Sequence, residues 1–148
     1  MVYVLVAALI CAVDLAVKEH IERKKEPITD KQILKGQITL TRLHNKGAFL
    51  NLMEKRQETI KLVSSSILAA LVGALVVLLP KKEDGLLKTG LAITIGGAAS
   101  NVYDRIKRNY VVDYFSFRKL KNVVFNIGDL FIFLGTFLIA IHSLFHKK

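Results

Sequence analysis

The sequence predicts an all-α membrane protein, a bundle of four transmembrane helices formed by one domain of 148 residues. Four apolar segments, residues 1–17, 62–79, 86–103 and 122–145, carry almost no charge, and charged connections separate them. Hydrophobic residues make up 52% of the chain, and the mean hydropathy is +0.39. Because the charge is segregated rather than spread evenly, the pattern indicates a bilayer rather than a soluble core.

The four segments differ in length and polarity. Segment 62–79 has 18 uncharged residues before Pro80, and segment 122–145 is interrupted only by Asp129. Both approach the roughly 20 apolar residues that a membrane-spanning helix needs. The other two segments are shorter, and we expect their ends to lie at the interface between lipid and water.

The connections predict how the helices are joined. Residues 18–61 form a long charged loop, in which residues 37–42 alternate polar and apolar side chains and therefore predict a strand. Residues 81–85 form a tight turn, and residues 104–121 form a second charged loop with an apolar centre at 110–117. With four spans, both termini lie on one side of the membrane, and the two long loops lie on the other.

The chain is strongly basic, with a formal net charge of +10. Because the basic residues flank apolar segments, we expect anionic lipid headgroups, and not nucleic acid, as their partner. Ten Lys and Arg residues lie in 18–56 and six in 105–121, whereas the turn and tail on the opposite side hold five. Read by the positive-inside rule, this bias places the two long loops in the cytoplasm.

Charged residues in the first span need an explanation, because they are costly in lipid. Asp14 and Lys18 are four residues apart, so they share a helix face, and we expect an interfacial ion pair with a structural role. The single cysteine, Cys11, lies in an apolar run and is expected to pack in the core. No basic region precedes it, so we expect a retained anchor rather than a cleaved signal peptide.

The third span combines small and polar residues. The run 96–100 (Gly-Gly-Ala-Ala-Ser) predicts close helix packing. Asn101, Asp104 and Arg105 then share one helix face, and Arg105 is expected to neutralise Asp104. This group is interpreted either as a salt bridge at the helix end or as part of a functional site.

Two further carboxylates lie in apolar surroundings without an obvious basic partner. Asp129 is inside the fourth segment with Asn126 on the same face, and Asp113 lies in the apolar centre of the second loop. Two such groups held together share a proton, because both cannot easily ionise. A pair of this kind can act as general base on water and as general acid on a leaving amine, as in an aspartic protease.

A zinc site and a Ser/His/Asp triad are the alternatives to this pair. His142 and His146 have the spacing of a zinc-binding helix, but no Glu follows His142, and Asp129 is expected roughly 20 Å away at 1.5 Å per residue. No metal is therefore expected. A Ser/His/Asp triad lacks a nucleophile-elbow motif.

Five sequence motifs, in order, resemble those of the lipoprotein signal peptidase (signal peptidase II) family. They cover nearly the whole chain. Asp14 and Lys18 match an Asp and a Lys at the end of the family's first span, and Asn45, Gly47 and Ala48 match Asn-x-Gly-Ala. Residues 96–105 match a small-residue run leading to Gly-Asn-x-x-Asp-Arg. Residues 111–114 match Val-Val-Asp-Phe, and residues 125–129 match Phe-Asn-x-Ala-Asp.

The resemblance implies four transmembrane helices with a small extracytoplasmic β-rich cradle. It implies that Asp113 and Asp129 are a catalytic dyad without cofactor or metal, and that the substrate is a bacterial prolipoprotein, cut before a diacylglyceryl-modified Cys. It implies a location in the bacterial cytoplasmic membrane, with cytoplasmic termini and the dyad near the outer face. This orientation opposes the charge bias. A monomer is enough for this chemistry, and we expect one. Supporting roles are implied for Asp14, Lys18, Asn45, Gly47, Asn101, Asp104, Arg105 and Asn126.

The chain also departs from the family's pattern. Ser100 stands where Gly is usual, Gly128 where Ala is usual, and Leu130 where Ser is common. These positions flank the expected site, so two alternatives stay open: a divergent relative that binds lipidated peptides without cutting them, and a small proton-coupled transporter that uses the two Asp residues as a relay. Transporters often contain internal repeats, and none is evident in this sequence.

Overall fold

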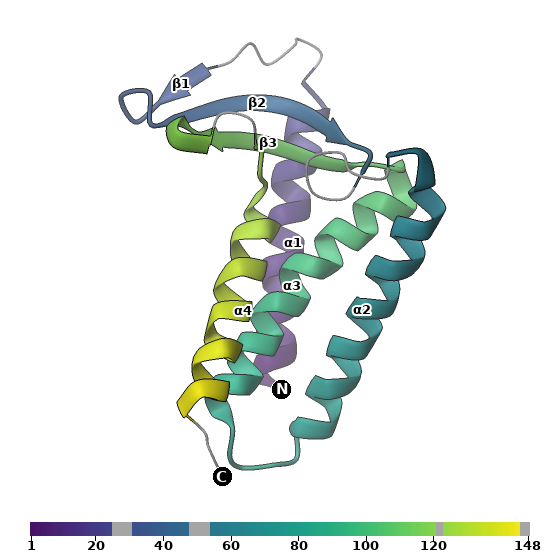
Figure 1. Cartoon of the computed structure of the whole chain (residues 1–148), viewed down its shortest axis with the longest axis vertical. Coiled ribbons are helices and arrows are strands. Elements are labelled where there is room, and N and C mark those ends of the chain that lie inside the picture. The colour runs from purple at the N-terminus through teal and green to yellow at the C-terminus, as the bar shows by residue number, and fades with distance from the viewer. Residues whose placement is uncertain (25–30, 48–53, 121–122, 146–148) are drawn as a thin grey trace.

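The computed structural model describes residues 1–24, 31–47, 54–120 and 123–145, and within them four long helices stand beneath a small sheet (Figure 1). In chain order the elements are α1 (Val2–Glu22), β1 (Lys31–Ile33), β2 (Ile38–Asn45), the short 3-10 helix η2 (Glu54–Arg56), α2 (Gln57–Leu78), α3 (Gly85–Arg108), β3 (Val111–Phe117), the 3-10 helix η3 (Arg118–Leu120) and α4 (Ile127–Phe145).

Helix α3 is the centre of the bundle, and it packs against all three other long helices. Its small residues permit this closeness. A Cβ atom on Gly96 would lie 2.8 Å from the Ala7 carbonyl oxygen of α1, and one on Gly97 would collide with the Gly128 carbonyl oxygen of α4. The close packing expected at this run is confirmed, since any larger residue at Gly97 would force the two backbones apart.

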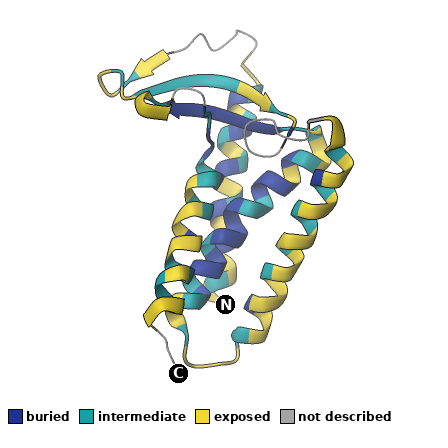
Figure 2. Ribbon diagram, in the orientation of Figure 1, coloured by how far each residue is buried: buried dark blue, intermediate teal, exposed yellow. Residues whose placement is uncertain are grey.

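Helices α2 and α4 face outward. Each is long and apolar enough to cross a membrane, with mean hydropathies of 2.2 and 1.9 in their most apolar windows, yet only 11% of each window is buried. Figure 2 shows the contrast between these exposed helices and the buried centre at α3. Apolar side chains that face outward along a helix need an apolar solvent, so this surface is suited to lipid.

The helices do not coincide with the apolar segments of the sequence. Helix α1 continues to Glu22, α3 continues to Arg108, and α4 begins only at Ile127. The polar end turns of α1 and α3 are helical because they pair with each other, as Arg108 does with Glu19 at 2.5 Å. Before α4 the chain bonds to the sheet instead, through a bridge between Phe125 and Phe115.

The sheet has the strand order β1-β2-β3, and both pairings are antiparallel. The strand predicted at 37–42 is confirmed as part of β2, and the apolar centre of the second loop forms β3. A register shift between Leu40 and Leu43 separates two blocks of pairing, and beyond it Asn45 pairs with Val111. This pairing places Asn45 at the end of β2 nearest the start of β3.

The sheet lies across one end of the bundle, and the N-terminus and the end of α4 lie at the opposite end (Figure 1). The start of α1 and the end of α4 thus lie at the same end of the bundle. The core beneath the sheet joins the sheet to the helices, and it consists of Ile21, Val112, Tyr114, Phe115 and Phe125.

Candidate active site

Asp113 reaches the site from β3, and its side chain is almost completely buried, with 2% exposed. Two amides bind its carboxylate: the Asn45 Nδ2 donates to Oδ2 at 3.0 Å, and the Asn126 Nδ2 donates to Oδ1 at 2.6 Å. Burial, followed by the charge of Asp129, raises the pKa of Asp113 to about 7. Asp113 therefore holds a proton at a pH where an ordinary aspartate is ionised.

Asp129 lies in the first turn of α4, not in the middle of a span as its place in segment 122–145 suggested. The Asn126 backbone N–H donates to Asp129 Oδ2 at 3.1 Å, and the Asp129 backbone N–H donates to Asn126 Oδ1 at 2.9 Å. This reciprocal arrangement is a capping box. The positive end of the helix dipole favours a carboxylate at this position.

Asn126 contacts both carboxylates. Its side-chain amide group donates to Asp113, and its backbone amide donates to Asp129. Its side-chain oxygen is occupied by the Asp129 backbone, so the orientation of the amide is fixed. The two aspartates, 16 positions apart in the sequence, are thus held around one completely buried side chain.

A second asparagine connects Asp129 to Lys18. The Asn101 Nδ2 donates to Asp129 Oδ1 at 2.8 Å, and the Asn101 Oδ1 accepts from Lys18 Nζ at 2.7 Å. Because an ammonium group is only a donor, it must face the oxygen of Asn101, and this leaves the nitrogen of Asn101 facing the carboxylate. Lys18 therefore fixes which end of Asn101 meets Asp129.

Lys18 and Asp14 form the expected ion pair, at 2.8 Å, but both side chains are fully buried rather than interfacial. Asp14 also accepts from Ser100 at Oδ2 and from the Tyr114 hydroxyl at Oδ1, at 3.1 Å for Tyr114. The Tyr114 oxygen in turn accepts from the Ile127 backbone N–H at 3.0 Å. Asp14 thus joins α1 to α3, to β3 and to the start of α4.

The sequence suggested that Arg105 neutralises Asp104, but the ion pairs of Asp104 are with other residues. Asp104 lies within α3, and its ion-pair partners are Arg108 at 3.0 Å and Lys18 at 3.4 Å. Its Oδ2 also accepts from the Val112 backbone N–H at 3.1 Å. Arg108 is one helical turn after Asp104, which places the two side chains on one face. Asp104 therefore anchors the start of β3 and does not contact either of the two site aspartates.

Arg105 instead lines a groove beside Asp129. The groove has a volume of about 430 Å³ and lies between α2, α3 and α4. Its polar side chains include Ser64 and Thr136, whose hydroxyls donate to carbonyl oxygens of their own helices, so little polarity remains toward the groove. The groove is lined by Ser64, Ile67, Leu71, Thr94, Ala98, Asn101, Val102, Arg105, Asp129, Ile132, Thr136 and Ile139.

The remaining residues considered from the sequence are Gly47 and the histidines at the end of the chain. Gly47 is buried, and its backbone N–H donates to Asn45 Oδ1 at 3.2 Å, which orients the Asn45 amide toward Asp113. His142 lies 3.4 Å from Asp84 at the end of the bundle away from the sheet, and His146 is outside the described residues. His142 therefore lies at the opposite end of α4 from Asp129.

Two contributors were not assigned a role from the sequence: Tyr114 and Arg108. Tyr114 stands where the family motif has Phe, so its additional hydroxyl was the available signal. Arg108 follows Asp104 by four residues, which is the ordinary spacing for a helical ion pair, but the helix was expected to end before it.

The fold and the site together define a helical membrane protein that holds two buried carboxyl groups around one asparagine. Residues 6–145 match the model of the family described as Signal peptidase (SPase) II. The chain therefore belongs to the signal peptidase II family.

The relatives agree over the full length. The chain is 32% identical to the lipoprotein signal peptidase of Clostridioides difficile, with 100% of this chain and 98% of that protein covered. It is 31% identical to the lipoprotein signal peptidase of Lactobacillus johnsonii, with 97% and 92% covered. A bacterial membrane enzyme solved by the in meso method has the same fold, with a TM-score of 0.84, 22% identity, and 99% and 92% of the two chains covered.

Proposed function

We propose that this protein is an aspartic endopeptidase that removes the signal peptide from bacterial prolipoproteins, with Asp113 and Asp129 as its catalytic pair. The observation that supports it is the convergence of these two carboxylates, from β3 and α4, on Asn126. The substrate class follows from the family and from relatives named lipoprotein signal peptidase.

The chemistry requires one proton on the pair. The ionised carboxylate takes a proton from water, the water oxygen attacks the scissile carbonyl carbon, and the protonated carboxyl donates to the developing oxyanion. The C–N bond then breaks as a proton passes to the leaving amine. The two aspartates titrate as one unit, so the base and the acid are not assigned separately.

The neighbouring groups support this reaction by position. Asn45, Asn101 and Asn126 bind the carboxylates as neutral donors, so they orient them without supplying a full opposing charge. Arg105 lines the same groove as Asp129, so its guanidinium is available to negative charge on the substrate. No metal or other cofactor is needed for these steps.

The groove between α2, α3 and α4 is where we place the signal peptide. It is mainly apolar, and it ends at Asn101, Arg105 and Asp129. An apolar helix could bind along α2 and α4 while its scissile bond lies at the polar end. The acyl chains of the diacylglyceryl-Cys would then face the surrounding lipid.

We further propose that all four long helices span the membrane as a monomer in the bacterial cytoplasmic membrane. In this arrangement, the termini are cytoplasmic and the sheet is extracytoplasmic, so the carboxylate pair lies near the outer face, where a prolipoprotein is cut. Reporter fusions after Lys148 and near Lys31 test this orientation. A cytoplasmic reporter at Lys31 would contradict it.

The decisive experiment is cleavage of a purified diacylglyceryl-modified prolipoprotein in detergent. We expect cleavage by the wild type and its loss in Asp113→Asn and Asp129→Asn, with Glu58→Gln as a matched control, because Glu58 is an exposed carboxylate that pairs only with Lys61 among the described residues. Cleavage by either Asn variant would reject the pair. A folded wild type that binds the substrate without cutting it would favour the binding-only alternative.

A further inference from the structure

One end of the sheet projects beyond α4, at the turn between β1 and β2 (Figure 1). Helix η3 lies against this turn, because the Arg118 backbone N–H donates to the Gln37 carbonyl oxygen at 2.9 Å. We call this region the overhang. Its exposed members are Leu34, Lys35, Arg118, Lys119 and Leu120.

Leu34 lies at the tip of the overhang, and both its exposure and its backbone conformation are unfavourable for a leucine. Its side chain is 68% exposed, and its backbone has a φ of 50°, followed by 56° at Lys35 and 78° at Gly36. Left-handed conformations are unfavourable for residues other than glycine. Leu120 in the adjoining η3 is also 50% exposed. Two leucines displayed at one end of a sheet indicate contact with an apolar phase.

The charge around these leucines has one sign. Across the described strands, the turn 34–37 and η3, the only acidic residue is Asp113, and it is buried. Lys35, Arg118 and Lys119 are all exposed at the overhang. Cations that flank exposed apolar side chains are the pattern of a protein surface that binds anionic lipid.

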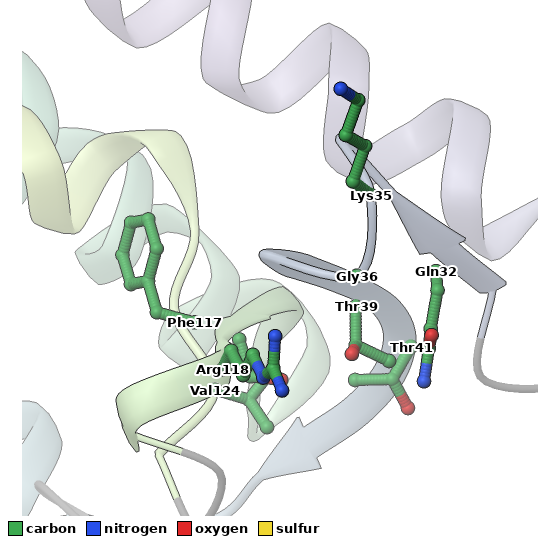
Figure 3. A pocket seen from close by; sticks show the side chains of 9 residues that line it. Gln32, Lys35, Gly36, Thr39, Thr41, Phe117, Arg118 and Val124 are labelled. Atoms are coloured by element: carbon green, nitrogen blue, oxygen red, sulfur yellow. The ribbon is translucent and has the colours of Figure 1, made fainter.

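A polar cavity of about 610 Å³ adjoins the overhang. Cross-strand pairing aligns Gln32 with Thr39 and Thr39 with Ser116, so polar side chains run across all three strands. Figure 3 shows Arg118, Thr39, Thr41 and Gln32 gathered in one region, whereas Lys35 and Phe117 point away from it. A guanidinium beside hydroxyl and amide groups suits a phosphodiester that carries hydroxyls.

The position of the overhang matches the level of lipid headgroups. Figure 1 shows the sheet across the end of the helices, with the overhang beyond α4. On α4, Phe133 and Phe137 are 54% and 62% exposed. The ring of Phe133 packs against that of Phe125 beneath the sheet, with 6.2 Å between the ring centroids. Lipid chains that cover these phenylalanines would therefore bring their headgroups up to the overhang.

We propose that the overhang is a binding site for the headgroups of anionic phospholipids. Arg118 binds a phosphate beside the polar side chains, Lys35 and Lys119 attract neighbouring anionic headgroups at the surface, and Leu34 and Leu120 enter the apolar region beneath them. The site lies in the leaflet on the sheet side of the protein. The proposal depends on the membrane location and not on the peptidase activity. It also gives a role to three of the basic residues on the side that we place outside the cell, Lys35, Arg118 and Lys119.

The chain contains no tryptophan, so Leu34→Trp provides a single fluorescent reporter. In nanodiscs that contain phosphatidylglycerol we expect a blue-shifted emission and strong quenching by brominated acyl chains, compared with nanodiscs of phosphatidylcholine alone. Arg118→Gln with Lys119→Gln should remove the difference. Raising the salt concentration should reduce it, since salt screens exposed charges. Leu120→Trp serves as a second reporter if the first variant does not fold.

The matched control is Lys81→Gln with Lys82→Gln, in the turn at the opposite end of the bundle, which should leave the difference unchanged. Equal emission in the two lipids for both reporters would overturn the proposal. So would a blue shift that appears only after a prolipoprotein is added, because the overhang would then bind the substrate instead. Neither readout requires cleavage, so the outcome is separate from the peptidase test.

Discussion

Ser100 and Gly128 meet at the same oxygen atom of Asp14. The Ser100 hydroxyl donates to Asp14 Oδ2, and a Cβ atom built on Gly128 would lie 2.8 Å from that oxygen. The family pattern has a smaller residue at position 100 and a larger one at position 128. The two departures from the family pattern therefore affect the same oxygen of Asp14.

The first prediction concerns this exchange. Gly128→Ala should destabilise the protein by about 1–3 kcal/mol, because the added methyl overpacks Asp14, Asn126 and the Gly97 carbonyl. Ser100→Gly should relieve part of that strain. The double variant should therefore lose less stability than the two single variants lose when their losses are added. Thermal unfolding of all three variants in detergent measures the coupling. Additive effects would show that the two positions are independent.

A second prediction concerns Lys18, which is fully buried between Asp14 and Asp104. Lys18→Met should cost about 3–5 kcal/mol, because it leaves buried carboxylates without their shared cation. Lys61→Met is the control, since Lys61 pairs with the exposed Glu58 and should change stability by about 0.5 kcal/mol or less. Thermal unfolding compares the two variants, and equal losses would contradict the network described here.

A third prediction separates two tasks of Asn126. Asn126→Ser should keep the cap of α4, because Ser is about as good an N-cap as Asn, yet it removes the amide group that donates to Asp113. We expect near-normal stability and a loss in cleavage rate of roughly 100-fold or more. Asn126→Ala should lose both, with about 1 kcal/mol less stability. Normal cleavage by the Ser variant would show that the donor to Asp113 is dispensable.

A fourth prediction concerns pH. The pKa of Asp113 is raised to about 7 by burial and by Asp129. Cleavage should therefore fall as pH rises through about 7, because the pair loses the proton that its acid donates. A cleavage rate that stays constant from about pH 6 to about pH 8 would contradict a shared proton on the pair.

The same shift predicts an effect on stability. Between the unfolded value of 3.8 and about 7, the folded state binds more protons at Asp113, so the free energy of unfolding should fall as pH rises through this window. Asp113→Asn should remove that component. Melting temperatures of the wild type and the variant, at about pH 5 and about pH 8, measure the difference.

Much of the fold could be predicted from apolar segments and periodicity, because a span and a half-buried strand each have a local signature. Helices at residues 62–79 and 86–103, and the strand at 37–42, correspond to α2, α3 and β2. The helices extend beyond the apolar segments where partners distant in the sequence decide the helix ends. Arg108 remains helical because Glu19, 89 positions earlier, pairs with it.

The sequence was enough to select the candidate residues but not to predict their hydrogen bonds and ion pairs. Asp113, Asp129 and Asn126 stood out because polar groups in apolar surroundings are costly. Spacing alone suggested that Arg105 neutralises Asp104, but on the folded protein Arg108 and Lys18 do so. Whether Asp104 pairs with Arg105, or with Arg108 and Lys18, depends on where α1 packs against α3. No local pattern in the sequence contains that information.

The capping box of α4 has a consequence for biogenesis. Asp129 takes its position from the first turn of α4, and Asp113 takes its position from β3, which pairs with β2 about 70 residues earlier in the chain. Asp129 is therefore oriented by its own helix, whereas Asp113 is oriented only after β2 and β3 have paired. In a newly synthesised chain, Asp113 and Asp129 therefore come together only after the start of α4 has packed beside β3, where Asn126 bonds to both residues.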